Sequence, residues 1–347
     1  MKKLIALALC LCMVFAMTAC QTTTSPSAST EPGDQPTGGS ESPEAVETTG
    51  ANALGDSDAM VYSSLYASEV SSLNYLIEGA TNEQTVGANV IDTLVEYNST
   101  AELVPGLAET WKCSEDGLTW TFHLRQGQKW YDYTGAEVGE VTANDFVAAA
   151  KYVLTPEYDS SLEYMFEEAN ILNAAAYYAG EVTDFAEVGV KAVDDYTLQY
   201  IVDKPTPYLL SCMTYGSFMP AYGPQLEELG ADFATACEKM YCCGAFILTE
   251  FEPQVKHVFV KNVNNWDADN VHIDRIEQIY NAEAATLAPT MALRGEVDYA
   301  DLSNDIIDDW KANNPDIISR GRAIPDFSYF FCFNFDPQYE AEYGPDN

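Results

Sequence analysis

Basic residues are scarce in this sequence. The chain has 16 lysine and arginine residues against 54 aspartate and glutamate residues, and its formal net charge is −38. No lysine or arginine occurs between Lys3 and Lys112. Because binding to nucleic acid phosphates requires clustered basic side chains, nucleic acid is excluded as a partner. The excess of acidic residues is typical of a protein kept soluble outside the cell, and attraction of cationic ligands is a weaker consequence.

Catalytic signatures are also missing. The sequence has three histidines, His123, His257 and His272, and none stands in a recognisable triad or metal motif. Neither G-x-S-x-G nor H-E-x-x-H occurs. We therefore expect a protein that is not an enzyme and uses no cofactor, and we keep an exported hydrolase as the less favoured alternative.

The N-terminus has the pattern of a secreted lipoprotein. Two lysines precede an apolar run, Leu4 to Met17, which is too short to span a bilayer comfortably. Small residues then lead to Cys20, in an arrangement that resembles a bacterial lipobox. We expect residues 1–19 to be a signal peptide and the lipid on Cys20 to anchor the protein at the extracytoplasmic face of the membrane. An ordinary signal peptide cut near Ala19 is the alternative.

The segment after the lipobox lacks large apolar residues. Residues 20–57 consist mainly of Ser, Thr, Pro, Gly and Glu, and no second hydrophobic stretch in the chain is long enough to span a membrane. Such a composition cannot bury enough surface to fold. We expect a disordered tether that lifts a globular part away from the bilayer.

Six cysteines remain after the signal peptide and Cys20, and their irregular spacing indicates no disulfide framework. Cys237, Cys242 and Cys243, together with His257, have the composition of a metal site. Adjacent cysteines are awkward zinc ligands, however, so we expect no metal and favour buried thiols or a disulfide.

Three turn sequences between β-prone runs predict β-hairpins. The hairpins span 111–124, 189–202 and 245–261, with turns at Asp116-Gly117, Asp194-Asp195 and Glu252-Pro253. In the first hairpin Trp120, Phe122 and Leu124 share one face, so His123 is expected on the surface rather than in a catalytic site.

Helical periodicity predicts helices over 85–95, 141–154 and 284–293, and a strand opens at 60–62. The second helix begins with Thr142 and Asp145, which are spaced as a capping box. Because strands, hairpins and helices interleave without an internal repeat, the fold class is mixed α/β.

A series of short motifs then occurs in a fixed order. It consists of Leu103–Trp111, Asp116–Arg125, Lys129-Trp130, Gly135, Val141–Phe146, Gly189–Leu198, Pro205–Tyr208, Gly244–Phe246, Lys261-Asn262, Trp266-Asp267 and Gly295–Asp298. Each motif is weak alone, but the ordered series resembles the extracellular peptide-binding receptors of ABC importers, in the oligopeptide and dipeptide branch. The resemblance covers nearly all of residues 59–334.

The resemblance implies an α/β, bilobal, periplasmic-binding-protein-like receptor with an extra domain inserted in its first lobe. The implied boundaries are 58–95 for the first part of the first lobe, 96–206 for the extra domain, 207–330 for the second part of the first lobe and 331–347 for the start of the second lobe. We therefore expect a C-terminally truncated chain in which most of the second lobe is missing. The missing part would include the acidic residue that holds the peptide α-ammonium in the oligopeptide branch.

The resemblance also implies the function and the partners. A receptor of this kind captures extracellular oligopeptides and delivers them to an ABC permease with its ATPase subunits, and we expect it to act as a monomer. Hydrogen bonds to the ligand main chain give tolerance of sequence, and closure of the lobes signals occupancy. A nickel complex or an opine is the alternative solute, since the family includes such members, and a purely structural or adhesive lipoprotein is a further alternative.

Carried over residue by residue, the resemblance implies a peptide-binding site. Glu78, Gly79 and Ala80 match the segment that meets the peptide backbone, and the alternative is a simple loop before a helix. Tyr215 matches a pocket-lining position, and the alternative is a buried core tyrosine. Ser303 and Cys332 fall near the hinge and the pocket wall. Cys332 stands where the family has an acidic or other polar residue, which leaves the substrate preference open.

Overall fold

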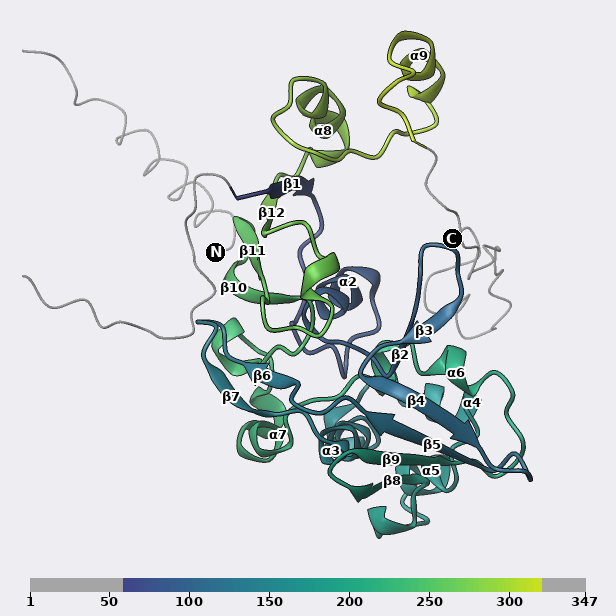
Figure 1. The fold of residues 1–347 in the computed structure, drawn as a ribbon. Helices are drawn as coiled ribbons and strands as arrows, with labels where there is room; N and C mark the ends of the chain where they lie inside the picture. The colour runs from purple at the N-terminus through teal and green to yellow at the C-terminus, as the bar shows by residue number, and fades with distance from the viewer. Residues whose placement is uncertain (1–58, 320–347) are drawn as a thin grey trace, which may run out of the picture. The chain divides into compact units, whose positions relative to one another are not determined.

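The computed structural model describes residues 59–319 (Figure 1). The predicted signal peptide, Cys20, the predicted tether and Cys332 lie outside the described residues. Between residues 59 and 319, no helix has both the length and the apolar character needed to cross a bilayer. Because the tether lies outside the described residues, its expected disorder stays a prediction.

One four-stranded sheet joins segments that are far apart in the sequence, in the order β1-β12-β11-β10. Its strands are β1 (Val61–Tyr66), β10 (Phe246–Glu252), β11 (Lys256–Lys261) and β12 (Arg275–Tyr280). The outer strand β1 runs parallel to β12, and the other pairs are antiparallel. The predicted hairpin over 245–261 is thus confirmed. The four residues from His257 to Val260 are buried, because β11 is a central strand with both faces covered.

A second four-stranded sheet is antiparallel throughout, in the order β4-β5-β9-β8. Its strands are β4 (Ala108–Cys113), β5 (Thr119–Leu124), β8 (Val190–Asp194) and β9 (Thr197–Ile201). Both predicted hairpins of this region are confirmed. Phe122 and Leu124 are buried while His123 is exposed, as the alternation of the first hairpin predicts.

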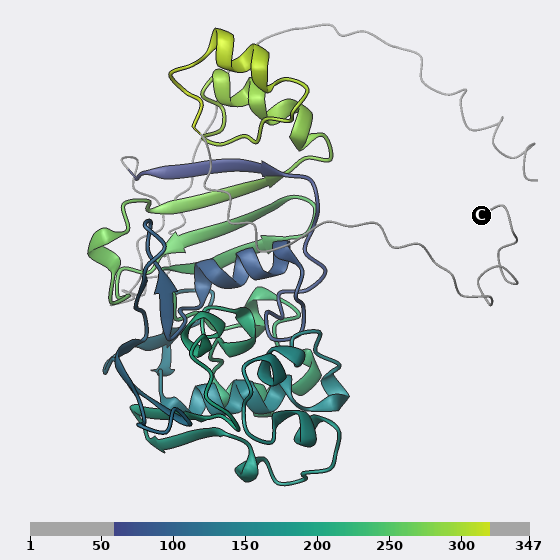
Figure 2. The ribbon, with the colours of Figure 1, turned by 90° about the vertical axis from the view of Figure 1, so that its right-hand side faces the viewer.

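Short ribbons and helices connect and cover the sheets (Figures 1 and 2). The ribbons are β2 (Val95–Tyr97) with β3 (Leu103–Pro105), and β6 (Lys129–Tyr131) with β7 (Glu137–Glu140). The helices are α2 (Thr81–Val90), α3 (Ala143–Val153), α4 (Tyr164–Glu168), α5 (Ala174–Tyr178), α6 (Leu209–Cys212), α7 (Gly223–Leu229), α8 (Ala284–Leu293) and α9 (Ile307–Asn313). Helix α2 contacts β10, α3 contacts β8 and β9, and α8 contacts β1.

The start of α3 follows the predicted capping box. The Asp145 carboxylate accepts hydrogen bonds from the Thr142 backbone N–H at 2.8 Å and from the Trp130 indole N–H at 3.2 Å. It also accepts the Gly223 backbone N–H at 3.0 Å, which links α3 to the start of α7. One carboxylate therefore caps a helix and joins three segments of the core.

The helix predicted over 85–95 is wrong at both ends, because α2 spans Thr81–Val90. Its last carbonyl, on Val90, accepts the backbone N–H groups of Cys243 at 3.0 Å and Gly244 at 2.8 Å. Gly244 approaches so closely that a Cβ atom there would lie 2.7 Å from the Val90 carbonyl carbon. A distant segment thus takes over the carbonyl that the next helical turn would have used, and Val95 begins β2 instead.

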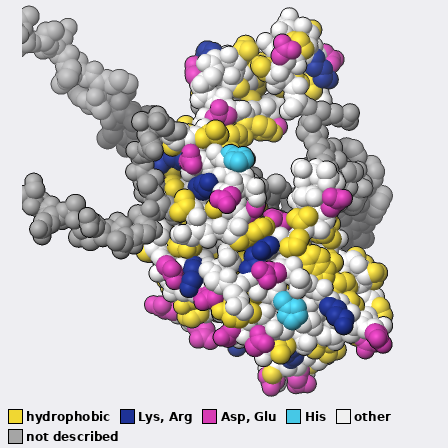
Figure 3. Space-filling model, in the orientation of Figure 1, with side chains coloured by type: hydrophobic (Ala, Val, Ile, Leu, Met, Phe, Trp, Pro, Cys, Tyr) yellow, Lys and Arg dark blue, Asp and Glu magenta, His cyan; other side chains and the backbone are white. Residues whose placement is uncertain are grey.

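One connected hydrophobic core extends through both sheets and includes Phe259 on the first sheet and Phe122 and Tyr200 on the second. Acidic side chains are spread over the face seen in Figure 3 rather than gathered in one patch. The boundaries of the first lobe and the extra domain stay a prediction.

Candidate functional site

The predicted peptide-binding segment Glu78–Ala80 forms the loop that leads into α2. The side-chain amide of Gln84 donates to the Glu78 carbonyl oxygen at 2.6 Å and to the Tyr75 carbonyl oxygen at 3.1 Å, which fixes the course of the loop. The Gly79 N–H donates to the Ser161 hydroxyl at 3.1 Å. Gly79 and Ala80 are exposed. A side chain at Gly79 would press against Ser161 and Leu162, so packing within the chain already favours a small residue at this position.

The fold brings Tyr215 to this loop from far along the sequence. Tyr215 precedes the 3-10 turn Gly216–Phe218. A Cβ atom on Gly216 would overlap the Gln84 side-chain oxygen, so this turn lies directly against the residue that holds the Glu78 carbonyl. The Tyr215 side chain is 45% exposed and is therefore not a buried core tyrosine. The predicted loop before α2 and the predicted Tyr215 thus lie in one region.

Ser303 lies elsewhere, beyond the edge strand β1. The chain reaches it through a parallel bridge between Ser64 and Tyr299, and the Asp298 carboxylate accepts the Ser63 backbone N–H at 2.7 Å. Among residues 59–319, no hydrogen bond joins Ser303 to the loop before α2. Whether these residues bind a peptide stays a prediction, and Cys332 lies outside the described residues.

The cysteines that suggested a metal site are free thiols in the structure. Cys237, Cys242 and Cys243 are buried, and burial raises the pKa of each thiol. Within the part of the chain that the structure describes, no three metal-ligating side chains converge. Buried thiols in this state act as small apolar side chains.

His257 instead pairs with Glu69, in an arrangement that the sequence did not predict. Its ring Nε2 lies 2.9 Å from the Glu69 carboxylate, and the ring stacks between Tyr66 and Phe251. Glu69 also accepts the Tyr66 hydroxyl at 2.9 Å and the Gln254 backbone N–H at 2.6 Å. Burial raises the pKa of the Glu69 carboxyl, but these hydrogen bonds outweigh it and hold the pKa below its ordinary value. The loop after β1 is therefore tied to the β10–β11 hairpin.

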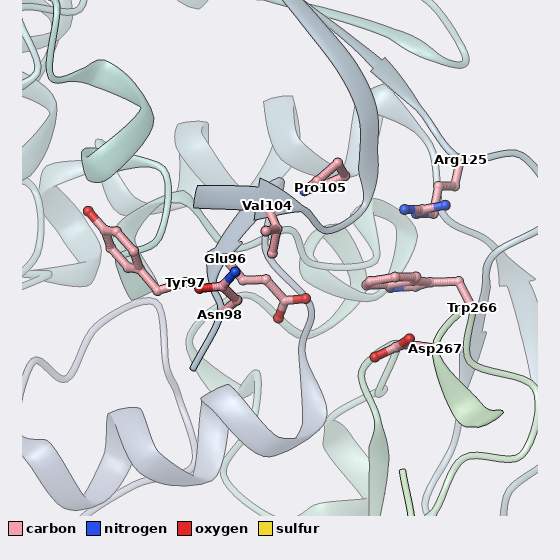
Figure 4. A pocket seen from close by; sticks show the side chains of 8 residues that line it. All are labelled: Glu96, Tyr97, Asn98, Val104, Pro105, Arg125, Trp266 and Asp267. Atoms are coloured by element: carbon pink, nitrogen blue, oxygen red, sulfur yellow. The ribbon is translucent and has the colours of Figure 1, made fainter. Parts of the chain in front are cut away.

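A hollow of about 490 Å³ opens beside the β2–β3 ribbon, and we call it the β2–β3 hollow. Its lining residues are Glu96, Tyr97, Asn98, Val104, Pro105, Arg125, Trp266 and Asp267 (Figure 4). The Arg125 guanidinium lies 4.1 Å from the centre of the Trp266 ring, and its Nε–H donates to the Gly106 carbonyl at 2.7 Å. The ribbon, the end of β5 and the turn after β11 thus meet at one place.

Asp92 holds the turn after β11 that contributes Trp266 and Asp267 to the β2–β3 hollow. Its carboxylate accepts the Trp266 indole N–H at 2.9 Å and the Asn265 amide at 2.8 Å. Burial raises the pKa of Asp92 to about 6, although these two hydrogen bonds oppose the rise. Burial, followed by the charges of Asp92 and Asp267, raises the pKa of Glu96 to about 7. Asp92 was not singled out from the sequence, and its position between Ile91 and Leu94, which are both buried, was the only local signal.

Comparison with known proteins agrees with the fold described above. Residues 102–342 match the model of the bacterial extracellular solute-binding proteins, family 5 (middle region). The chain is similar to the oligopeptide-binding protein AmiA of Streptococcus pneumoniae, with 38% identity over 63% of this chain and 33% of the relative. It is also similar to the oligopeptide-binding protein SarA of Streptococcus gordonii, with 35% identity over 69% of this chain and 38% of the relative.

Solved structures of peptide receptors are similar as well. The murein tripeptide binding protein MppA of Escherichia coli has a TM-score of 0.67 and 27% identity, over 75% of this chain and 49% of that one. The Haemophilus influenzae OppA complex with the peptide RPPGFSPFR has a TM-score of 0.67 and 26% identity, over 74% and 48%. The chain thus spans about half the length of these solved receptors and about a third of the streptococcal relatives. The fold is that of part of a periplasmic peptide-binding receptor, and the chain belongs to family 5 of the bacterial extracellular solute-binding proteins.

Proposed function

We propose that this protein is the substrate-binding lipoprotein of an ABC importer, which captures oligopeptides outside the cell and delivers them to a membrane permease. The observation that carries the proposal is the similarity to oligopeptide-binding relatives and to receptors solved with a peptide bound. Binding and release suffice for this role, so no covalent step is assigned to any residue. The acidic composition is compatible with a location outside the cell.

The proposed peptide site uses the loop Glu78–Ala80, Tyr215, Ser303 and Cys332. Exposed backbone at Gly79 and Ala80 leaves room for an extended ligand to approach, and main-chain hydrogen bonds would accept many peptide sequences. Tyr215, which is 45% exposed and precedes the turn packed against Gln84, offers an apolar surface to a ligand side chain.

Attachment to the membrane is proposed through a lipid on Cys20. The apolar run before Cys20 and the polar, Ser- and Thr-rich segment after it support this proposal. Several acyl chains together would hold the protein at the surface, because each buried methylene adds to the affinity for the bilayer. Residues 20–57 would then give the folded part freedom to reach the permease.

The test is mass spectrometry of ligands that co-purify with the mature product of the native gene. We expect a mixture of short peptides. An Ala80→Trp variant should lose most of them, because an indole would fill the space beside the exposed backbone. Ala175→Trp is the matched control, since Ala175 is also exposed and stands at the start of α5.

One result would contradict the proposed function, and another would contradict the proposed site. Absence of peptides from the wild-type protein, with another solute in their place, would refute the peptide function. Equal peptide recovery from both tryptophan variants would leave the function standing but would place the peptide away from the Glu78–Ala80 loop.

A further inference from the structure

The β2–β3 hollow presents an aromatic wall that is held rigidly in place. The Trp266 indole is fixed at its N–H by Asp92 and on one face by the Arg125 guanidinium. Figure 4 shows Arg125 and Asp267 on opposite sides of the indole, with Glu96 pointing toward it from across the hollow. Trp266 lines the hollow, and its face away from Arg125 is the one that borders Asp267.

The hollow also carries negative charge that the described residues do not neutralise. Within residues 59–319, no hydrogen bond or ion pair engages the Glu96 carboxylate. Asp267 receives one bond, from the Asn270 amide at 2.6 Å, on one of its two oxygens. Counting Asp92, which holds the Trp266 indole N–H, three carboxyl groups are grouped here against the one guanidinium of Arg125 among the lining residues. A cation placed here would restore the balance of charge.

The other polar groups of the hollow are already engaged. The Tyr97 hydroxyl donates to Ser211 at 3.0 Å, and the Asn98 side chain is bonded to Thr100 and Glu102. These residues shape the hollow but offer little to a ligand. Recognition would therefore depend on two carboxylates and one indole face, a combination that attracts organic cations.

We propose that the β2–β3 hollow binds organic cations through a guanidinium or primary ammonium group, separately from the proposed peptide site. The cation would lie against the Trp266 face that borders Asp267 and donate hydrogen bonds to the Glu96 and Asp267 carboxylates. The volume of about 490 Å³ is enough for a group of this size with part of its alkyl chain. An anion is disfavoured by the surplus of carboxylates over the one guanidinium.

The test follows the Trp266 indole N–H by NMR while N-butylguanidinium is added to the 347-residue protein. N-Butylurea, which has the same shape without the charge, is the control ligand. We expect a saturable shift with N-butylguanidinium and none with N-butylurea. Glu96→Gln should weaken binding about tenfold, because it removes one charge-assisted contact. Glu115→Gln, which makes the same change of charge at an exposed turn, should leave the affinity unchanged.

Further measurements separate the sources of the cation. Tighter binding of the blocked tripeptide acetyl-Gly-Arg-Gly-amide than of spermidine would assign the hollow to an arginine side chain of a peptide or protein, and the reverse order to a free polyamine. The blocked termini keep this probe distinct from a ligand recognised by its α-ammonium. Equal binding of N-butylurea, or equal weakening by Glu96→Gln and Glu115→Gln, would overturn the proposal.

Discussion

Replacing Asp92 by asparagine should make the protein more stable at neutral pH relative to the wild type. Asparagine has the same shape and keeps an oxygen that can accept the Trp266 indole N–H and the Asn265 amide. It removes a carboxylate whose ionised form is destabilised by burial. The substitution therefore isolates the cost of the charge from the value of the hydrogen bonds.

The magnitude follows from the pKa of Asp92, which burial raises from 3.8 to about 6. A folded-state pKa above the unfolded value means that the folded protein holds this proton more tightly, so the contribution to stability is present at low pH and is lost as the pH rises through about 6. Two pKa units correspond to about 3 kcal/mol in total. Between pH 4.5 and pH 7.5 the wild type should lose about 2 kcal/mol relative to Asp92→Asn.

The assay is urea unfolding of both proteins at a series of pH values, followed by circular dichroism. Asp269→Asn is the matched control, because Asp269 is exposed on the turn after β11 that Asp92 holds. Its free energy of unfolding should run parallel to that of the wild type. If Asp92→Asn also ran parallel to the wild type from pH 4.5 to 7.5, the carboxyl would not be ionising at an unfavourable buried site, and the reasoning would be refuted.

Three further predictions concern other parts of the chain. Glu69→Gln should lower the free energy of unfolding by about 1–2 kcal/mol at pH 7. Because the pKa of Glu69 is lowered in the folded state, this difference should shrink as the pH falls below 4 in the same urea assay. A difference that stayed constant with pH would contradict the prediction. The affinity for N-butylguanidinium should rise from pH 6 to pH 8, because Glu96, with its pKa raised to about 7, becomes ionised over this range beside Asp92, Asp267 and Arg125. An affinity that did not change with pH in NMR titrations would contradict this. Cys20→Ala should release the protein from membranes and abolish labelling by a fatty-acid probe, and persistent labelling would exclude Cys20 as the anchor.

Local patterns were sufficient to predict much of the secondary structure. The Asp116-Gly117 turn and the capping box of Thr142 with Asp145 depend on residues that are close in sequence, and both are present in the structure. The end of α2 was not predictable in this way. It depends on Cys243 and Gly244, which donate to the Val90 carbonyl from more than a hundred residues away, and no local pattern encodes that contact.

The candidate sites show the same limit, because contacts between residues distant in the sequence could not be predicted from local patterns. The peptide-binding residues were predicted from a resemblance, and the fold places Tyr215 beside the loop at Glu78 without testing whether a peptide binds there. The pairing of Glu69 with His257 was missed, because a single histidine in a strand has many possible neighbours. Its position directly before the apolar residues Val258, Phe259 and Val260 was the available indication that it would be buried and would need a polar partner.

The acidic composition of the chain could not locate the β2–β3 hollow, because most acidic residues are spread over the surface, as Figure 3 shows for one face. The charged side chains are brought together there by a turn that one hydrogen bond holds in place. Asp92 holds the Trp266 indole N–H, and this contact fixes the turn that carries Asp267 opposite Glu96. Asp92→Asn keeps the hydrogen bond and removes one charge, whereas Glu96→Gln removes a carboxylate of the wall itself. If the hollow binds cations by direct contact, the second change should weaken binding more than the first, even though Asp92 is the more deeply buried group.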